Sequence, residues 1–425
     1  MKEDGILDIA FLCGIFPGNM RNEIMSNSRG NVQNAANELQ KAYIRGLEKV
    51  NHAPVKLINA PFLGSYPRNY KKAYVKKYRF SHTPGAKDIS VGFFNVTGIN
   101  NYHKALGLER EAEKWAGKDS HGKKKVLLAY SATYSVLRAL SGIKRKHPEI
   151  ITCLIAPDLP QYMNFAVHSN LWYYLVNQFL ISPLDRYLKQ VDTFVVLTRY
   201  FAERLPMEGK PYVIIEGICR PVPGFVKEQP IKTTKNKVLL YTGSLERQYG
   251  IIDLIKAFLL IPKKNYELWI CGSGNARNYV MQAEEKDPRI KYFGQVTYSE
   301  ALALQQQADV LINPRSGISG EYTKYSFPSK TLEYLASGKP VLMKRLPGIP
   351  EEYYKYVYII PDGPTYVMSV YIELILSLPK EYLEAEGMRG REFVLTSKNQ
   401  VTQCGKVLKM LLDYRTGTDQ RADRK

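Results

Sequence analysis

The chain has 425 residues, 45% hydrophobic and 24% charged, which is ordinary for a globular protein. No apolar stretch reaches the ~20 residues that a membrane-spanning helix needs. The net charge is +20, so anionic partners such as a membrane surface or a nucleic acid have to be considered.

The N-terminus, MKEDGILDIAFLCGIF, places acids ahead of its apolar run, whereas a secretory signal begins with positive charge. We therefore expect residues 6–16 to form a first, buried β-strand, as their continuous apolar run favours. Residues 17–30 would then be a long connection, and long connections in compact domains are usually functional or disordered. A helix is predicted over 31–50 from its helical spacing of apolar residues.

The remainder of the first half alternates strands and helices. Further strands, some of them running into helices, are predicted at 54–63, 125–140, 150–160, 191–205 and 211–218. None of the six histidines falls convincingly at a strand end, so Ser/His/Asp chemistry is not indicated.

Five cysteines are scattered through the chain without the spacing of a metal site or a disulfide framework. They are Cys13, Cys153, Cys219, Cys271 and Cys404. Most lie in apolar surroundings, so we expect small buried side chains in a reducing cytoplasm.

Residues 69–80, NYKKAYVKKYRF, interleave five cations with four aromatic residues. Such a segment can lie on anionic lipid or bind nucleic acid, and a solvated basic loop is the alternative. Near a membrane each cation contributes roughly 1 kcal/mol. The apolar segment 165–181 is either a second membrane-facing surface or a core helix.

A second series of strands and helices begins after a segment rich in proline and lysine. We predict an N-terminal domain over 1–219, a linker over 220–236 and a C-terminal domain over 237–395. A C-terminal helix over 396–414 could return to the N-terminal domain, and 415–425 is a polar tail. The predicted fold class is α/β, with two Rossmann-like domains whose parallel sheets face each other across a cleft. Ligands of such sheets bind at the carboxyl ends of the strands.

The sequence SFPSKTLEYLASGKPV (326–341) indicates a helix that begins with small polar groups and a cation. Helix N-termini present unpaired N–H groups and partial positive charge, which suit a phosphate. Glu333, one turn into this helix, could accept hydrogen bonds from the hydroxyls of whatever carries the phosphate.

The order YTGSLERQYGIIDLIKAF, ELWICGSG, RIKYFGQV, ADVLINPR and FPSKTLEYLASGKPVL resembles the nucleotide-sugar domain of GT-B glycosyltransferases of family 4. The resemblance covers residues 237–350 well and the N-terminal half weakly. It is greatest to bacterial enzymes that build capsule, O-antigen or exopolysaccharide units.

The resemblance implies that Glu333 binds the ribose of the nucleotide and that the turn before it approaches the diphosphate. Ser329, Lys330 and Thr331 would offer N–H groups there. The implied donor-binding residues are Gly14, Gly18, Gly243, Ser244, Gly272, Phe327, Ser329, Lys330, Thr331 and Glu333.

The chain departs from the family pattern at two places. Ser244 and Tyr249 stand where relatives carry an arginine and a lysine that neutralise the leaving diphosphate. We hypothesise that Arg247, Arg315 and Lys330 supply this charge. 

The second departure is Tyr325, which stands where relatives carry a first motif glutamate, and Glu321 could replace it. At the end of the strand over 150–160, Asp158 could orient or deprotonate an acceptor hydroxyl, or simply form a turn. No DxD pair indicates a divalent metal, and no cofactor is expected.

The resemblance implies a retaining, metal-independent transfer of a sugar from a nucleotide diphosphosugar to a hydroxyl of a polyprenyl-diphosphate-linked saccharide. The protein would work in the cytoplasm, peripherally on the inner face of an anionic membrane. A catalytically silent nucleotide-sugar-binding partner subunit is one alternative, and a basic nucleic-acid-binding protein is another. No nucleic-acid fold signature accompanies the charge.

Overall fold

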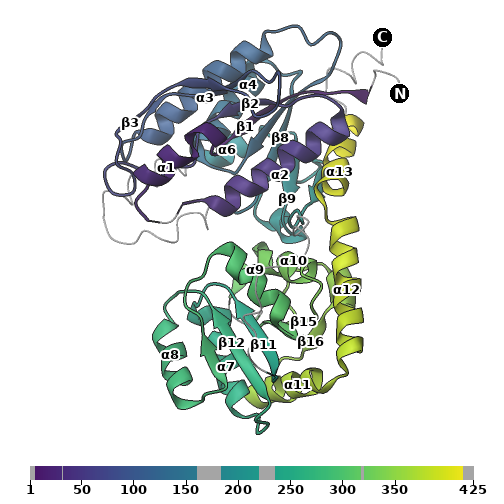
Figure 1. Ribbon diagram of the computed structural model, residues 1–425. Coiled ribbons are helices and arrows are strands. Elements are labelled where there is room, and N and C mark those ends of the chain that lie inside the picture. The colour runs from purple at the N-terminus through teal and green to yellow at the C-terminus, as the bar shows by residue number, and fades with distance from the viewer. Residues whose placement is uncertain (1–4, 31, 160–182, 220–234, 317–319, 415–425) are drawn as a thin grey trace. The chain divides into compact units, whose positions relative to one another are not determined.

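The computed structural model describes residues 5–30, 32–159, 183–219, 235–316 and 320–414. It divides into two compact units (Figure 1). The first unit contains the chain up to Glu216 and again from Gln400, and the second contains Gly217–Asn399. The division falls just before the boundary predicted at residue 219, and most of the predicted linker, 220–234, lies outside the described residues.

The first unit is built on an eight-stranded sheet in the order β10-β9-β8-β7-β1-β2-β5-β4. The strands are parallel except β4, which pairs antiparallel with β5. Their bounds are β1 Asp8–Cys13, β2 Lys56–Asn59, β4 Tyr78–Phe80, β5 Asp88–Ser90, β7 Lys125–Tyr130, β8 Ile151–Ala156, β9 Thr193–Val196 and β10 Tyr212–Ile214. Strands β1, β7 and β8 are almost wholly buried, as their continuous apolar runs predict.

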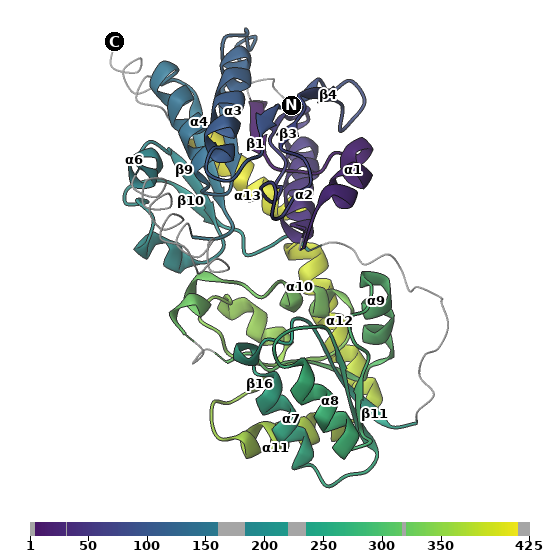
Figure 2. The same ribbon diagram turned by 90° about the vertical axis from the view of Figure 1, so that its left-hand side faces the viewer.

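Helices cover both faces of this sheet. Helices α3 (Asn100–Ala116) and α4 (Tyr134–Lys146) pack side by side on one face (Figure 2). Helix α2 (Asn34–Asn51) packs against α13 (Gln400–Asp413). Shorter elements are the 3-10 helices η2 (Gly18–Met20) and η4 (Arg199–Glu203) and the helices α1 (Arg21–Asn27) and α6 (Leu184–Leu188).

The structure adds detail to three local predictions. The long connection predicted over 17–30 contains η2 and α1, so it is folded and the disordered alternative does not apply. The segment 191–205 runs from β9 into a helix, as predicted, and this helix is short and of the 3-10 type. The predicted C-terminal helix over 396–414 is also shorter: α12 extends to Ser397 and α13 begins at Gln400.

The basic segment 69–80 is mostly ordered structure, not a free loop. It contributes the edge strand β4 and the strand β3 (Tyr74–Val75), which pairs with β6 (Phe93–Phe94). Three of its lysines bind within the unit: Lys71 to the Ser26 carbonyl at 2.7 Å, Lys72 to Glu23 and Lys77 to Glu111. Charged residues on an edge strand also prevent further strand pairing.

The second unit contains a six-stranded parallel sheet in the order β13-β12-β11-β14-β15-β16. The strands are β11 Lys237–Thr242, β12 Tyr266–Cys271, β13 Ile290–Tyr292, β14 Val310–Asn313, β15 Val341–Lys344 and β16 Tyr358–Ile360. The α-helices are α7 Ile251–Leu259, α8 Arg277–Lys286, α9 Tyr298–Gln307, α10 Ser329–Ala336, α11 Thr365–Ser377 and α12 Lys380–Ser397. Three 3-10 helices are also present: η5 Arg247–Tyr249, η7 Glu321–Tyr325 and η8 Glu351–Tyr356.

Each face of this sheet has its own hydrophobic core. Helix α7 packs against α8 and α11, and α10 packs against α12. Phe258 and Ile372 belong to the first core, whereas Leu335 and Phe393 belong to the second. The strand and helix positions agree with the alternating pattern predicted for 237–345.

All five cysteines lie in the described residues, where they are buried, as predicted, and none of them is in a disulfide. Burial raises the pKa of the Cys271 thiol to about 12. Over the part of the chain that the structure describes, no helix has the length and apolarity to cross a bilayer. The apolar segment 165–181 falls outside the described residues.

Candidate functional site

The predicted donor-binding residues of the second unit gather at the carboxyl edge of its sheet. Strand β11 ends at Thr242, β12 at Cys271 and β14 at Asn313, and α10 begins just beyond β14. This is the edge at which open α/β sheets bind ligands.

Glu333 is held in place by two donors on one of its carboxylate oxygens. Gln305 Nε2 lies 2.7 Å and Lys330 Nζ 2.8 Å from Glu333 Oε1. The Glu333 side chain is 18% exposed, and within the described residues its Oε2 has no hydrogen-bond donor. One oxygen is therefore fixed by the protein while the other can accept from a ligand.

The next residue, Tyr334, anchors α10 to the end of β11. Its hydroxyl accepts from the Thr242 N–H at 2.8 Å and lies 3.0 Å from the Thr242 carbonyl, to which it donates. Gln305 Nε2 also reaches Thr242 Oγ1 at 3.2 Å. This buried network links α9, α10 and β11, so it fixes the position of the Glu333 carboxylate.

The first turn of α10 offers fewer free N–H groups than the sequence predicts. The Thr331 N–H donates to the Pro328 carbonyl at 2.8 Å, so it is not available to a diphosphate. Ser329 and Lys330 are the first two helical residues, and their N–H groups have no acceptor within the helix. The Thr331 hydroxyl is buried and has no partner among the described residues.

Phe327 contributes its side chain to the core and not to the site. It is 9% exposed, and its ring packs 5.3 Å from that of Tyr353. The predicted role of Phe327 in donor binding is therefore limited to its backbone.

Arg315, just after β14, is held between two aromatic rings. Its guanidinium carbon lies 5.1 Å from the Tyr249 ring centroid and 5.0 Å from that of Tyr322. Nη2 donates to Ser326 Oγ at 3.0 Å, while Nε is buried without a partner in the described residues. Tyr249, which replaces the expected lysine, thus stacks against an arginine.

Arg247 begins η5, and its side chain is exposed. Its N–H donates to Asn275 Oδ1 at 2.8 Å, which joins the loop after β11 to the loop after β12. Ser244 is exposed, and its carbonyl accepts from the Tyr241 hydroxyl at 2.7 Å.

Gly243 and Gly272 allow those two loops to touch. A Cβ at Gly272, which has φ +137°, would lie 1.7 Å from the Gly243 carbonyl oxygen. The N–H groups of both glycines are already bonded, that of Gly243 to the Cys271 carbonyl and that of Gly272 to the Gly294 carbonyl. Both glycines therefore shape the edge rather than donate to a ligand.

Tyr325 and Glu321, the two candidates for the missing first motif glutamate, contact each other. The Tyr325 hydroxyl lies 3.4 Å from Glu321 Oε1. Tyr325 is 2% exposed, whereas Glu321 is exposed, so Glu321 is the one with solvent access.

In the first unit the two predicted glycines differ. The Gly14 N–H donates to Gln40 Oε1 at 2.7 Å, and a Cβ there would lie 2.3 Å from the Phe62 ring. Gly14 is thus required for packing, and its N–H cannot serve a diphosphate. Gly18 is exposed at the start of η2, with no atom near its missing side chain.

Asp158 follows β8 by two residues, at the carboxyl edge of the first sheet. Burial by surrounding atoms raises the pKa of its carboxyl to about 6, although the residue remains exposed at the surface, where solvent reduces the shift. At neutral pH the group is mostly ionised and can accept a proton.

Sequence reasoning missed Gln305 and Tyr322 as parts of this site, and it did not predict the contact of Tyr249 with Arg315. The triplet QQQ at 305–307 carries no motif, and the partners of an aromatic ring depend on tertiary contacts. Among the residues that the structure describes, no group of three His, Cys, Asp or Glu side chains could hold a metal ion.

The chain is similar to known proteins in two ways: one segment matches a protein family, and the fold matches solved structures. Residues 236–370, within the second unit, match the family described as Glycosyl transferases group 1. Curated protein sequences give no match to the chain.

Solved structures resemble nearly the whole chain. Sucrose-phosphate synthase from Thermosynechococcus elongatus has 15% identity and a TM-score of 0.60, over 95% of this chain and 99% of that one. A trehalose-6-phosphate structure from E. coli, bound with UDP-2-fluoro glucose, has 9% identity and a TM-score of 0.64, over 96% and 99%.

WaaG, a glycosyltransferase involved in lipopolysaccharide biosynthesis, has 13% identity and a TM-score of 0.55, over 96% and 100%. At these identities the likeness concerns the fold. The predicted fold class, two α/β domains with parallel sheets of the GT-B type, is confirmed.

Proposed function

We propose that this protein is a glycosyltransferase that moves a sugar from a nucleotide diphosphosugar to a hydroxyl group. The family match over 236–370 and the GT-B fold support this class of reaction. A structural neighbour is described as bound with UDP-2-fluoro glucose, which is a nucleotide sugar analogue. The second unit would bind the donor at the carboxyl edge of its sheet.

The observation that carries the proposal is the Glu333 carboxylate, with Oε1 fixed by Gln305 and Lys330 and Oε2 open. An ionised oxygen can accept both hydroxyls of a ribose, and each hydrogen bond to a charged group contributes roughly 1.5–3 kcal/mol. Gln305 and Lys330 hold the carboxylate in one orientation before the ligand binds, which reduces the entropy lost on binding.

In the reaction, the bond between the sugar C1 and the diphosphate oxygen breaks and a bond from C1 to the acceptor oxygen forms. Arg315, Lys330 and Arg247 would stabilise the charge that develops on the leaving diphosphate. Asp158, with a pKa of about 6, would take the acceptor proton. We further propose that the anomeric configuration is retained and that no metal takes part, so activity should persist in a chelator.

The acceptor that we propose is a polyprenyl-diphosphate-linked saccharide in cell-surface polysaccharide synthesis, reached from the cytoplasmic face of a membrane. Exposed apolar side chains on the first unit support peripheral contact: Tyr74, Phe94, Ile99, Tyr102 and Leu106 are 38–48% exposed. The Tyr74 and Phe94 rings lie 5.1 Å apart, and Lys76 on the same segment is exposed. Aromatic residues beside cations favour membrane interfaces.

The test is a thermal-shift screen with UDP, GDP, dTDP, ADP and their sugars, followed by a transfer assay with the sugar that stabilises most. A ligand that binds the folded state raises the unfolding midpoint as its concentration passes Kd. We expect one base to dominate, and Glu333→Gln to weaken its binding by about tenfold to a hundredfold. Glu381→Gln, an exposed acid on the first turn of α12, is the matched control and should bind normally.

No stabilisation by any nucleotide would refute the proposal. Binding without transfer or hydrolysis would favour the second candidate, a silent nucleotide-sugar-binding subunit. The specific observation behind that candidate is that Ser244 and Tyr249 replace the two loop cations of active relatives.

A further inference from the structure

The first unit contains a basic cavity at the opposite edge of its sheet from Asp158. It has a volume of about 780 Å³ and is lined at the amino ends of β1 and β2 by Asp8 and Lys56. The hairpin of β4 and β5 and the last turns of α3 complete its wall. Strand β1 has six residues, which at about 3.3 Å each separate the two edges by roughly 20 Å.

The acids in this cavity are already bonded to protein donors. Asp88 accepts from the Leu57 N–H at 2.9 Å and from His82 Nδ1 at 2.6 Å. Asp8 accepts from Trp115 Nε1 at 3.0 Å, and Glu111 pairs with two lysines. The three acids offset only half of the six cations that line the cavity, Lys56, Lys77, Arg79, Lys87, Lys114 and Lys118, so its lining keeps a positive net charge.

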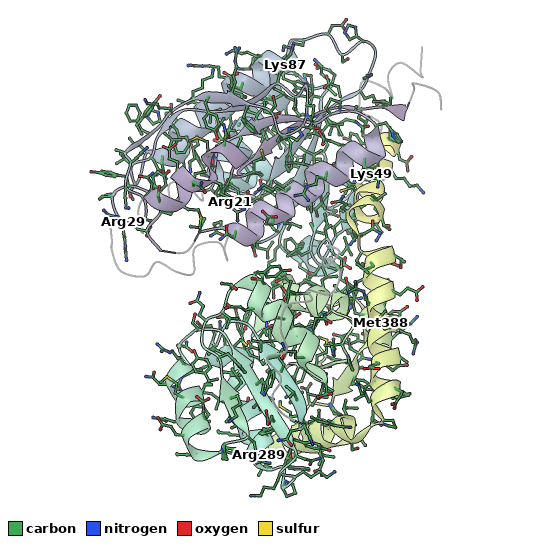
Figure 3. The ribbon with its side chains drawn as sticks, viewed as in Figure 1. Arg21, Arg29, Lys49, Lys87, Arg289 and Met388 are labelled. Carbon is green, nitrogen blue, oxygen red and sulfur yellow. The ribbon has the colours of Figure 1, made fainter. Side chains whose placement is uncertain are left out.

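Four cations in the same wall have no side-chain partner within the described residues. Lys56 is half-buried, while Arg79, Lys87 and Lys118 are exposed at the rim. Figure 3 labels Lys87 and Lys49, which lie apart from each other on the first unit in this view. Side chains of like charge that outnumber the acids around them repel one another, and a bound anion would relieve that repulsion.

The behaviour of Lys56 agrees with this arrangement. Its pKa is lowered, first by burial and then by the positive charges of Lys118 and Arg79, against which Asp88 and Glu111 raise it. A dianionic group beside Lys56 would offset both the desolvation and the repulsion.

We propose that this cavity is a second anion site, which binds a phosphate or diphosphate group separate from the sugar transfer. Because it lies at the amino edge of the sheet, its ligand is distinct from a group that reacts at the carboxyl edge. The rim cations attract the anion, and Lys56 contacts it at the floor. The inference does not depend on the proposed function, since no residue of the donor site is involved.

The experiment is a calorimetric titration of inorganic pyrophosphate at low ionic strength. All proteins carry Lys330→Gln, which weakens binding of the probe at the donor edge. Arg79→Gln/Lys118→Gln removes two rim cations, and Lys49→Gln/Arg145→Gln removes two exposed cations of the same unit that do not line the cavity. We expect the first pair to lower affinity at least tenfold and the second pair by no more than about twofold.

Two further readouts distinguish a site from a general charge effect. Trp115 lines the cavity, so its fluorescence should respond to pyrophosphate and the response should vanish in a Trp115→Phe variant. Without ligand, Arg79→Gln/Lys118→Gln should unfold at a midpoint no lower than the parent, because repulsion is removed. Equal weakening by both pairs, or no weakening by either, would overturn the proposal.

The phosphate group could belong to a soluble molecule or to a lipid headgroup. Sedimentation with vesicles of phosphatidate in phosphatidylcholine, compared with phosphatidylcholine alone, separates the two sources. Loss of vesicle binding in Arg79→Gln/Lys118→Gln, together with displacement by pyrophosphate, identifies a lipid phosphate. Unchanged vesicle binding, with pyrophosphate affinity reduced as above, identifies a soluble one.

Discussion

In the proposed donor site, Arg315 would provide positive charge where Ser244 and Tyr249 stand in place of the cations that the family resemblance implies. The rings of Tyr249 and Tyr322 flank the guanidinium, and Ser326 fixes one of its nitrogens. A side chain restrained on three sides loses little entropy when it binds a diphosphate, and its buried Nε still has a hydrogen to donate. We therefore propose that Tyr249 compensates for the lysine that the resemblance implies, by helping to position Arg315.

The corresponding prediction concerns turnover. Replacing Arg315, Lys330 or Arg247 by Ala should lower kcat by roughly a hundredfold, the scale for losing one preorganised transition-state contact. Arg315→Lys should not rescue the loss, because an ammonium lacks the planar fork that stacks between the two rings.

Steady-state kinetics with the donor identified by the screen would measure these effects. Arg289→Gln is the control, since Arg289 pairs with Asp287 away from the strand ends of the site. Near-normal rates for all three alanine variants would contradict the assignment.

The residues of the site differ in how far sequence could assign them. Glu333 and Lys330 are predicted because they belong to a motif of fixed spacing on one helix turn. Gln305 is not, because its hydrogen bond to Glu333 joins two helices through a tertiary contact. Gly14 was assigned to the ligand, but Phe62 and Gln40 occupy the places a ligand would need.

Among the elements, the β4–β5 hairpin pairs with β2 through β5, and one histidine also links it to α2. His82 donates Nδ1–H to Asp88 at 2.6 Å and Nε2–H to Glu48 of α2 at 2.8 Å. Burial lowers the pKa of His82, but the hydrogen bonds to Asp88 and Glu48 outweigh burial and raise the pKa to about 9. The imidazolium thus links the hairpin to α2.

We predict that this link makes stability depend on pH. The folded-state pKa is raised above the ordinary value of about 6.5, so the stabilisation is complete below pH 6.5 and is lost as pH rises through about 9. His82→Gln should cost on the order of 2 kcal/mol at pH 6 and much less at pH 10.

Urea denaturation at both pH values would test the pH dependence. His121→Asn is the matched control, because His121 is exposed on a turn with φ +51°, which Asn tolerates. A cost for His82→Gln that stays the same at pH 6 and pH 10 would refute the linkage.

The sequence predicts a strand or helix best where the apolar pattern of that one segment is enough to identify it. The buried parallel strands β1, β7, β8 and β11 follow from continuous apolar runs. The strands β3 and β4 could not be read from the basic segment 69–80, because their pairing partners, β6 and β5, lie further along the chain and supply the hydrogen bonds.

At the scale of the whole molecule, the first unit is assembled from both parts of the chain that flank the second. Helix α13 packs on α2, and Gly46 of α2 allows the contact: a Cβ there would lie 2.5 Å from Cys404 Sγ and from the Gln400 carbonyl. The stability of the first unit therefore depends on residues that the chain reaches only after completing the second.

From this connectivity we predict how a substitution between α2 and α13 changes stability. Gly46→Ala forces overpacking between α2 and α13 and should cost about 1–3 kcal/mol in the first unit. Gly405→Ala, on α13 with no atom near its missing side chain, is the matched control and should be neutral or stabilising by up to about 1 kcal/mol.

Because Gly46 belongs to the first unit and Glu333 to the second, Gly46→Ala should leave nucleotide affinity unchanged. Denaturation of variants that keep either Trp115 or Trp269 as their single tryptophan, followed by fluorescence, would separate the responses of the two units. An equal shift of both transitions, or a loss of nucleotide binding, would mean that the two units do not unfold independently.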